Sequence, residues 1–520
     1  MPDAQKPAAH AVLLHPNDHV CVAARDLMKG DTISVAGQSI TARVAVPLGH
    51  KVAHRPAAKG ETILKHGQPI GIATAEIAPG DWVHSHNLTA GEFSADYAKA
   101  TDAPPPPAPI ADRMFDGYRR AGGKAGTRNY LAVISTVNCT ASVCKYITRR
   151  FDRSTLAEYP NIDGVIALTH DTGCGMQFSG LKHELINRTL GGMARHPNIG
   201  AFLLIGLGCE QTSAGYLIEQ ERLVQIDGAT ASQPAGSPIV LTMQDLGGTQ
   251  ATVERGIELV AQLLPRADDV RREPISASQL IVGTECGGSD GNSGVTANPA
   301  VGVASDRIVA AGGTTVLSET SEIVGAEHLL TRRSRSVEVA DRLLERIRWW
   351  ENYVGNYGVE FEMNPSLGNK AGGLTTIVEK SLGAIAKGGA TSLNAVYEYA
   401  EPITEPGLVF MDTPGFDPVS ITGKMAGGAN LIVFTTGRGS CYGCKPVPSI
   451  KIASNTPMYA RLQDDMDIDA GRILAGTSVE QLGEEIFDEI LAVASGKQTK
   501  SEQHGIGEEE FIPWIVGPTL

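Results

Sequence analysis

The chain has 520 residues and a mass of 54.8 kDa, with 42% apolar and 20% charged residues, a composition that excludes disordered and collagen-like proteins. Its 44 basic and 58 acidic residues give a net charge of −14, which argues against a nucleic-acid ligand because Lys and Arg drive binding to phosphate backbones. No run of about 18 apolar residues predicts a membrane span, and residues 1–10 contain no basic leader or apolar signal core. We therefore expect a cytoplasmic protein without a membrane partner.

The first hundred residues alternate short β-type runs with Gly and Pro turns, which predicts a small β-rich domain over residues 1–100. The runs are 11–14, 19–23, 40–46, 62–65 and 70–75. Four consecutive prolines then occur in DAPPPPAP (102–109) and favour an extended linker, which we place at 101–110.

Beyond the linker, apolar strand-like runs alternate with amphipathic helical ones, such as 337–353, and this pattern predicts a large α/β layered region. We divide that region into domains 111–275 and 276–520. The strand candidates are 131–135, 164–168, 201–205, 279–282, 314–317 and 430–434. Several end in turns that contain Cys or Gly, and ligand crevices form at the carboxyl ends of strands in open α/β sheets.

Four of the eight cysteines follow apolar strands directly: Cys139 in TVNCT, Cys174 in THDTGCG, Cys209 in GLGCE and Cys286 in TECGG. In a reducing compartment they are thiols, and thiolates from separate loops can assemble a metal or iron–sulfur site. His170 lies four residues before Cys174, and its imidazole suits iron. These five residues are our candidate metal ligands; the alternative is that they are buried packing residues.

Other reactive side chains allow less specific interpretations. Glu210, next to a cysteine, and Glu319 and Glu322 in SETSE are candidate bases or oxygen ligands, with a solvated or salt-bridged role as the alternative. Cys441 and Cys444 form a CxxC pair in the loop GRGSCYGCKP. No second pair completes a zinc ribbon, and Gly and Pro oppose the helix that a thioredoxin-like motif would open.

Eight of the thirteen histidines precede the linker. His84 and His86 in VHSHN would share one side of an extended segment and could bind a metal or a carboxylate, or could simply be surface imidazoles. Two Gly-rich loops, NPSLGNKAGG with Asn369 and Lys370 and TTGRGS with Arg438, offer N–H groups and cations to an anion. Neither matches the phosphate-loop pattern, and no dinucleotide fingerprint stands out.

Longer motifs resemble the altronate and galactarate dehydratase family. They are TECGGSDGNSGVTANPAVG (284–302), NPSLGNKAGGLTTIVEKSLG (364–383), FTTGRGS (434–440), GTRNYLAV (126–133), IGLGCE (205–210) and SETSEIVGAEHLL (318–330). The N-terminal region, with LHPNDHV, GHKVA and HSHN, resembles the SAF-type β-clip module that the family carries. The resemblance thus extends over nearly all of the chain after the linker.

The resemblance implies a lyase that removes water from a hexonate or a related sugar acid, giving a 2-keto-3-deoxy acid, with iron(II) as the usual metal. The two-histidine HSHN stretch favours altronate over galactarate as substrate. The CYGC stretch departs from both branches, whose members more often show TPYG there. Galactarate dehydration and sulfolactate sulfo-lyase activity are therefore alternatives, and a non-catalytic sugar-acid sensor is a third.

Dehydration needs a base for the C2 proton, stabilisation of the enolate and help for the departing C3 hydroxide. We expect iron to be held by Cys139, His170, Cys174, Cys209 and Cys286, either as one ion or as a cluster. Candidate catalytic residues are His50, His84, His86, Lys370 and Glu210. Candidate substrate-binding residues are Ser289, Asp290, Asn369, Lys370 and Arg438. A homodimer is the expected assembly, because symmetric dimers are the commonest oligomers.

Overall fold

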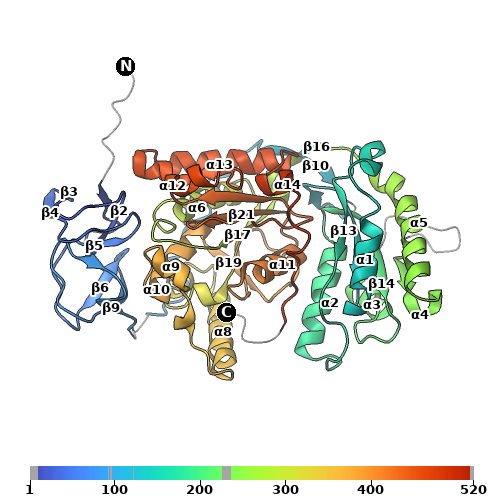
Figure 1. Ribbon diagram of the computed structural model, residues 1–520, viewed down its shortest axis with the longest axis horizontal. Helices are drawn as coiled ribbons and strands as arrows, with labels where there is room; N and C mark the ends of the chain where they lie inside the picture. The colour runs from blue at the N-terminus through green and yellow to red at the C-terminus, as the bar shows by residue number, and fades with distance from the viewer. Residues whose placement is uncertain (1–9, 92, 94–95, 121, 225–235, 516–520) are drawn as a thin grey trace, which may run out of the picture.

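The computed structural model describes residues 10–91, 93, 96–120, 122–224 and 236–515. The prediction that residues 1–10 contain no leader concerns mostly residues 1–9, which lie outside this described part. Within it, no helix combines the length and the apolarity needed to span a bilayer. Figure 1 shows a small β domain, a central α/β domain and a second α/β domain side by side.

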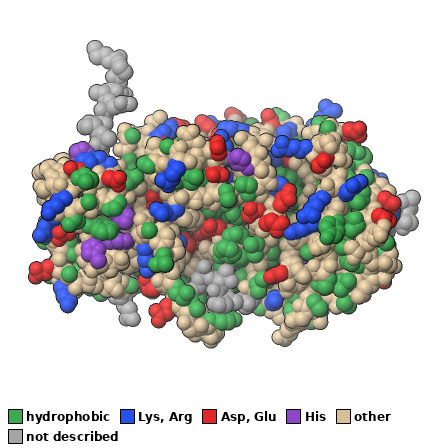
Figure 2. All heavy atoms as spheres, viewed as in Figure 1, with side chains coloured by type: hydrophobic (Ala, Val, Ile, Leu, Met, Phe, Trp, Pro, Cys, Tyr) green, Lys and Arg blue, Asp and Glu red, His purple; other side chains and the backbone are tan. Residues whose placement is uncertain are grey.

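The N-terminal domain consists of short strands, as predicted, arranged mainly as two antiparallel sheets with the orders β1-β2-β5-β8 and β6-β7-β9, plus the hairpin β3-β4. The strands are β1 (Ala11–Val12), β2 (Val20–Ala23), β3 (Thr32–Val35), β4 (Gln38–Thr41), β5 (Lys51–Ala53), β6 (Thr62–Lys65), β7 (Gln68–Ala73), β8 (Trp82–Val83) and β9 (Leu88–Thr89). Buried Val, Ile and Ala side chains fill the space between them. Histidine side chains gather over this domain at the left of Figure 2.

A proline-rich segment and a small sheet connect the three domains. The backbone of Ala100 donates to Thr331 O over 2.9 Å, and Ser392 Oγ donates to Pro104 O over 2.9 Å, so the linker lies on the central domain. The strands β10 (Met114–Arg119), β11 (Ala125–Gly126) and β16 (Glu273–Ser276) form an antiparallel sheet in the order β11-β10-β16. This sheet lies where the chain enters and leaves the second domain.

The second domain is a four-stranded parallel sheet in the order β13-β12-β14-β15, covered by helices. Its strands are β12 (Tyr130–Ser135), β13 (Gly164–Leu168), β14 (Ile199–Gly206) and β15 (Ile239–Thr242). Its helices are α1 (Ala141–Thr148), α2 (Leu181–Ala194), α3 (Ala214–Glu221), α4 (Met243–Leu246) and α5 (Thr249–Asp268). Strands β12 and β14 are buried along their whole length, which explains their continuous apolar sequences.

The central domain contains a seven-stranded parallel sheet in the order β19-β20-β18-β17-β21-β22-β23. The strands are β17 (Ile281–Cys286), β18 (Thr314–Leu317), β19 (Leu393–Tyr397), β20 (Gly407–Met411), β21 (Leu431–Thr436), β22 (Ser449–Ala453) and β23 (Ile468–Asp469). The helices are α6 (Ala297–Ala310), α7 (His328–Arg332), α8 (Val337–Gly355), α9 (Leu367–Ala371), α10 (Ile377–Ala384), α11 (Asp417–Gly427), α12 (Thr456–Arg461), α13 (Val479–Ala494) and α14 (Lys500–Gln503). Because the strands are parallel, the loops that follow them meet at one edge.

Candidate functional site

The loop at residues 287–291, directly after β17, collects most of the predicted substrate-binding residues. Asn369 Nδ2 donates to Ser289 O over 2.9 Å, and the backbone N–H of Arg438 donates to Gly288 O over 2.9 Å. Arg438 is exposed, and Lys370 is partly exposed. The segments that carry Lys370 and Arg438 therefore both contact the 287–291 loop.

Two side chains of this loop differ in how they are used. The carboxylate of Asp290 accepts hydrogen bonds from Ser293, from Ser454 Oγ at 2.7 Å and from Asn455 Nδ2 at 3.0 Å. Its oxygens thus fix the shape of the loop. Ser289 Oγ is buried and has no hydrogen-bond partner among the described residues, so it is left to bind a ligand.

The N-terminal domain contacts this edge through its GHK segment. Trp82 Nε1 donates to His50 Nδ1 over 3.2 Å, which leaves His50 Nε2 as the donor to Ala371 O at 3.3 Å. Burial, followed by the charge of Lys51, lowers the pKa of His50. Gly49 has a φ of +81°, and a Cβ there would lie 2.8 Å from Asn292 Nδ2. His50 is therefore a neutral residue that positions the domain contact.

Three charged groups are buried below this contact. Lys51 Nζ donates to Glu379 Oε2 over 2.9 Å and to Gly373 O over 2.7 Å, and Lys65 Nζ donates to Glu379 Oε1 over 2.8 Å. Burial would raise the pKa of Glu379, but the two ammonium groups and the Thr375 hydroxyl outweigh it and lower that pKa. Burial lowers the pKa of Lys51 to about 8.

The two histidines of HSHN lie in different surroundings. The stretch is a turn and not an extended strand, because Asn87 N donates to His84 O and Asn87 Oδ1 accepts from His84 N, both over 2.9 Å. His84 is buried, its ring stacks on Trp82 with the centroids 5.2 Å apart, and its Nδ1 has no described partner. His86 is exposed. Burial, followed by the charge of Lys51, lowers the pKa of His84 to about 4.

A buried group of thiol, carboxylates and lysines lies at the end of β17. Cys286 Sγ is 3.4 Å from Glu322 Oε2 and 3.7 Å from Glu319 Oε2. Lys380 Nζ donates to Glu322 Oε1 over 2.6 Å, and Lys387 Nζ donates to Glu319 Oε2 over 2.7 Å. Cys286, Glu319 and Glu322 form one of the two groups of potential metal-ligating atoms that the described residues bring within 4.8 Å. We call these three residues the acid–thiol centre.

A second part of this group lies beside it. Lys424 Nζ donates to Glu285 and to Ser318 Oγ, and Glu285, Glu319 and Asp417 form the other group within 4.8 Å. Burial, then Glu285, raises the pKa of Glu319 to about 7, and burial, then Glu319, raises that of Asp417 to about 7. The sequence reasoning missed Asp417 and the three buried lysines, although Lys380 lies inside the quoted motif EKSLG.

The other three predicted cysteine ligands lie on the second domain. Cys139, Cys174 and Cys209 are exposed and occupy the loops after β12, β13 and β14. We call these three residues the thiol edge. The structure thus divides the predicted ligands between two sheets, because β17, which carries Cys286, belongs to the central domain.

His170 and Glu210 lie near the thiol edge but are occupied by the protein. His170 Nδ1 accepts from Thr172 N over 3.2 Å, and its Nε2 contacts Ser135 O at 3.1 Å. Glu210 accepts from Thr136 Oγ1 over 2.8 Å and from Gly208 N over 2.7 Å. Both side chains therefore hold the loops that carry the cysteines.

Comparison with known proteins identifies the family. The SAF domain of altronate/galactarate dehydratases matches residues 9–91, the second domain of D-galactarate dehydratase/altronate hydrolase matches 117–268, and the C-terminal D-galactarate/altronate dehydratase domain matches 277–519. The altronate dehydratase of Escherichia coli is 39% identical over 498 residues, which cover 96% of this chain and 97% of that protein. The chain belongs to the altronate/galactarate dehydratase family.

Further relatives of this family have different substrates in their names. Galactarate dehydratase (L-threo-forming) of E. coli is 38% identical over 96% of both chains. The beta subunit of (2R)-sulfolactate sulfo-lyase from Chromohalobacter salexigens is 31% identical over 78% of this chain and 97% of that protein. The prediction of a carbon–oxygen lyase of this family is confirmed at the family level.

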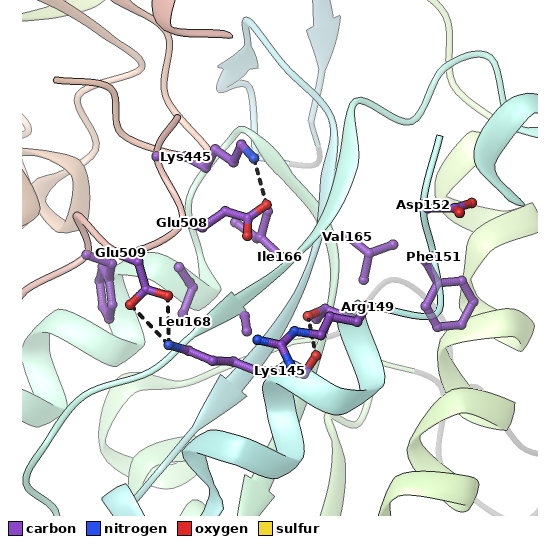
Figure 3. A pocket seen from close by; sticks show the side chains of 14 residues that line it. Lys145, Arg149, Phe151, Asp152, Val165, Ile166, Leu168, Lys445, Glu508 and Glu509 are labelled. Atoms are coloured by element: carbon purple, nitrogen blue, oxygen red, sulfur yellow. Dashed lines mark hydrogen bonds and ion pairs between the residues drawn. The ribbon is translucent and has the colours of Figure 1, made fainter. Parts of the chain in front are cut away.

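A separate pocket of this family member contains none of the predicted site residues. It has a volume of about 240 Å³ and lies between strand β13, helix α1 and the segment 507–511. Figure 3 shows its charged side chains paired across the opening, with Lys145 to Glu509 at 2.9 Å and Lys445 to Glu508 at 3.0 Å. The Lys145–Glu509 pair joins the second domain to the central domain, and we assign the pocket no catalytic part.

Proposed function

We propose that the chain is a hydro-lyase that dehydrates a sugar acid, with D-altronate as the favoured substrate, to a 2-keto-3-deoxy acid using iron as a Lewis acid. The observation that carries this proposal is that the segments of Lys370 and Arg438 both contact the 287–291 loop, which directly follows Cys286 of the acid–thiol centre. The 39% and 34% identical altronate dehydratases of E. coli and Bacillus subtilis support the choice of substrate.

Lys370 and Arg438 supply local positive charge, which the whole molecule lacks. With a net charge of −14, the protein's overall field repels an anionic substrate. Arg438 can bind a carboxylate through two parallel N–H donors, and Lys370 adds a second, compact charge. Ser289 Oγ offers a polar contact to a hydroxyl group of the sugar acid, and Asn369 supports this position through its bond to Ser289 O. Binding therefore depends on local charges and not on long-range attraction.

The acid–thiol centre fits an iron ion in its donor chemistry. Cys286, Glu319 and Glu322 offer one sulfur and two carboxylates, and Lys380 and Lys387 bind the carboxylates from the outside. While the Cys286 thiol is protonated, the two carboxylates balance the charges of the two lysines. Binding of Fe²⁺ would displace the thiol proton and leave the group with one net positive charge, which would attract a substrate carboxylate. When bound, iron would polarise the substrate carboxylate and a hydroxyl group.

The reaction breaks the C2–H and C3–O bonds and releases one water. A base removes the C2 proton, hydroxide leaves C3 with a proton from an acid, and the resulting enol becomes the 2-keto acid by losing its hydroxyl proton and taking a proton at C3. His84 is our base, since it is neutral at pH 7 and its Nδ1 has no described partner. Asp417 is our acid, because its Oδ2 lies against Gly287, only 2.2 Å from where a Cβ would be.

The substrate test compares altronate, galactarate and sulfolactate with the anaerobically purified, iron-loaded protein. We expect 2-keto-3-deoxy acid to form from altronate with the highest kcat/KM. Sulfite release from sulfolactate as the main reaction would instead assign the sulfo-lyase activity. Binding of all three acids without turnover would assign a sensor and contradict the proposal.

Matched variants test the binding loop. Arg438→Gln and Lys370→Gln should each raise KM for altronate at least roughly tenfold, because a charged hydrogen bond contributes about 1.5–3 kcal/mol. Lys497→Gln, at an exposed ion pair with Glu489, is the control and should leave KM unchanged. An unchanged KM in both loop variants would remove the loop from substrate binding.

We also propose that the enzyme acts in the cytoplasm as a homodimer on this small-molecule substrate alone. Light scattering of the purified protein should give twice the mass of 54.8 kDa. Neither DNA nor RNA should be retained at physiological salt. A monomer that is fully active would contradict the dimer.

A further inference from the structure

The thiol edge is left without a task by the proposed function, which uses only Cys286 among the strand-end cysteines. Its three loops follow β12, β13 and β14, which are neighbours in the sheet order β13-β12-β14. The carboxyl ends of neighbouring parallel strands lie at one edge. Three cysteines that are far apart in sequence are therefore presented together.

Backbone hydrogen bonds tie the three loops to one another beside the cysteines. Asn138, directly before the first cysteine, donates its N–H to Thr172 O over 2.8 Å. Gly173, directly before the second, accepts from Gln211 N over 2.9 Å, and Gln211 is two residues beyond the third cysteine. Each cysteine therefore lies within two residues of a bond to a neighbouring loop, which gives the three thiols a fixed common setting.

Glycines in the left-handed region shape the same loops. Gly173 has a φ of +106°, and a Cβ there would lie 2.6 Å from Thr136 O; Gly208 has a φ of +123°, and a Cβ there would lie 2.5 Å from Gln244 Oε1. Gly175 has a φ of +66°. Only glycine adopts such angles at no steric cost. Gly173 and Gly208, directly before Cys174 and Cys209, also allow a close approach of neighbouring atoms, whereas a Cβ at Gly175 would meet nothing within 4 Å.

The exposure of these thiols argues against a packing role. Cysteine is usually among the most buried residues, and Cys21, Cys144 and Cys444 are buried, with burial raising the pKa of Cys21 to about 12. The thiols of the thiol edge are all exposed. Gln244 Nε2 donates to Cys209 Sγ over 3.6 Å, a contact that would stabilise a thiolate. Three exposed thiols held by rigid loops are better explained by a ligand.

The donor set identifies the class of ligand. Within the described residues, neither group of potential ligand atoms within 4.8 Å of one another includes a residue of the thiol edge. No carboxylate or imidazole therefore forms a compact three-ligand group with these thiols, and the three Sγ atoms do not all lie within 4.8 Å of one another. An all-sulfur set selects soft metals and iron–sulfur clusters over Mg²⁺, Ca²⁺ or Mn²⁺. A structural zinc site needs four protein ligands, and the thiol edge supplies three.

We propose that Cys139, Cys174 and Cys209 hold an iron–sulfur cluster through three thiolates, with one iron left free of a protein ligand and the cluster distinct from the acid–thiol centre. Each thiol would release its proton to solvent as its Fe–S bond forms. Ferrous iron and inorganic sulfide are the co-reactants of assembly. The free iron would then be open to a small oxygen ligand.

The test uses the full-length protein, reconstituted without oxygen from ferrous iron and sulfide. We measure bound iron, acid-labile sulfide and the visible absorption spectrum for the parent and for Cys139→Ser, Cys174→Ser and Cys209→Ser. The parent should bind sulfide together with an equal amount of cluster iron and the one further iron of the acid–thiol centre, and it should absorb visible light. Each serine variant should lose most of the sulfide and of the cluster iron. Cys441→Ser, at an exposed thiol outside the thiol edge, is the matched control and should keep them.

A second readout covers a serine variant that folds poorly. In the parent, the reconstituted cluster should protect the three thiols, but not Cys441, from alkylation as measured by mass spectrometry. Iron without sulfide, sulfide that survives in all three serine variants, or equal alkylation of all exposed thiols would each overturn the proposal. Stoichiometric zinc bound in place of iron would overturn it as well.

The same samples separate this inference from the proposed function. Cys286→Ser should keep sulfide and the visible spectrum while losing sulfide-free iron and turnover. A cluster in a protein that dehydrates no sugar acid would leave the inference standing and remove the function. Protein that dehydrates altronate but binds no sulfide on reconstitution would do the opposite.

Discussion

The residues at the carboxyl edge of β17 show how a protein keeps several charges away from water. Glu319, Glu322 and Glu285 are fully buried, and each carboxylate contacts a lysine. Transfer of one charge from water into a protein interior costs several kcal/mol unless a partner and hydrogen bonds offset it. Glu319 also adopts a φ of +67°, which a non-glycine residue rarely takes. Both features are typical of functional sites.

Lys424→Met tests the energetic role of one such partner. The substitution leaves Glu285 buried without its cation, so the free energy of unfolding should fall by about 3–5 kcal/mol. Urea denaturation monitored by circular dichroism measures the change. The control Lys497→Met breaks an exposed pair with Glu489 and should change stability by no more than about 1 kcal/mol. Equal effects of the two substitutions would contradict the buried pair as a source of stability.

Gly173→Ala tests the loop geometry of the thiol edge. A left-handed φ costs a non-glycine residue about 1–2 kcal/mol, and the new Cβ would also lie 2.6 Å from Thr136 O. We expect a lower melting temperature and a loss of bound iron and sulfide. Gly215→Ala, within helix α3 where a Cβ meets nothing within 4 Å, should instead stabilise the protein slightly. Unchanged cluster content in Gly173→Ala would show that this loop tolerates a side chain.

At the scale of elements, the alternation of apolar and amphipathic runs was enough to predict the β-rich domain, the layered α/β region and strands such as Gly164–Leu168 and Thr314–Leu317, with the bounds the structure has. Strand β22 was not predicted, because it includes Lys451, whose buried Nζ donates to Tyr442 O over 3.0 Å. The predicted strand 279–282 begins at Ile281, because residues 277–279 form a 3₁₀ turn capped by Ser276.

The candidate site could be predicted only in part from the positions of the strand ends. The predicted strand ends locate Cys286 at the end of a strand and Arg438 on a loop. They do not show which strands share a sheet, since sheet order is set by packing between distant segments. Sequence therefore placed Cys286 with the cysteines of another domain. The buried lysines carried no signal of their own, because a lysine in an amphipathic run such as α11 is usually expected at the surface.

Asn455→Ala tests how one helix start supports the binding loop. Asn455 Oδ1 accepts from Met458 N over 2.9 Å at the start of α12, and its Nδ2 donates to Asp290 Oδ2 and to Gly437 O, each over 3.0 Å. Loss of a helix cap costs about 1 kcal/mol, and the lost bond to Asp290 should also raise KM. Ser478→Ala, which removes the cap of α13, should lower stability similarly with no change in KM. Equal KM values in the two variants would show that Asn455 caps α12 without supporting the 287–291 loop.

At the scale of the whole molecule, one buried carboxylate joins the N-terminal domain to the central domain. Glu379 belongs to α10, and its partners Lys51 and Lys65 belong to β5 and β6. The contact lies beside the 287–291 loop, where His50 meets Ala371. The charge state of Glu379 therefore affects both the contact between the two domains and the shape of the 287–291 loop beside it.

The pH dependence of stability should report this coupling. Because Lys51 and Lys65 lower the pKa of Glu379 in the folded state, the unfolded chain binds the proton more readily. The carboxylate therefore stabilises the fold above its ordinary value of 4.5, and that contribution is lost as the pH falls below it. The melting temperature of the parent should thus drop steeply below about pH 4.5.

Glu379→Gln should remove this part of the acid sensitivity and, at pH 7, lower the free energy of unfolding by about 3–5 kcal/mol, because two buried ammonium groups lose their counter-ion. Calorimetry from about pH 3 to about pH 7, a range that includes the titration of an ordinary carboxylate, measures both effects. Glu489→Gln, in an exposed pair, controls for the general loss of a carboxylate and should retain the parent's profile. If Glu379→Gln instead keeps the parent's acid sensitivity, the N-terminal domain is held by its apolar contacts alone, and the 287–291 loop keeps its shape independently of this charge.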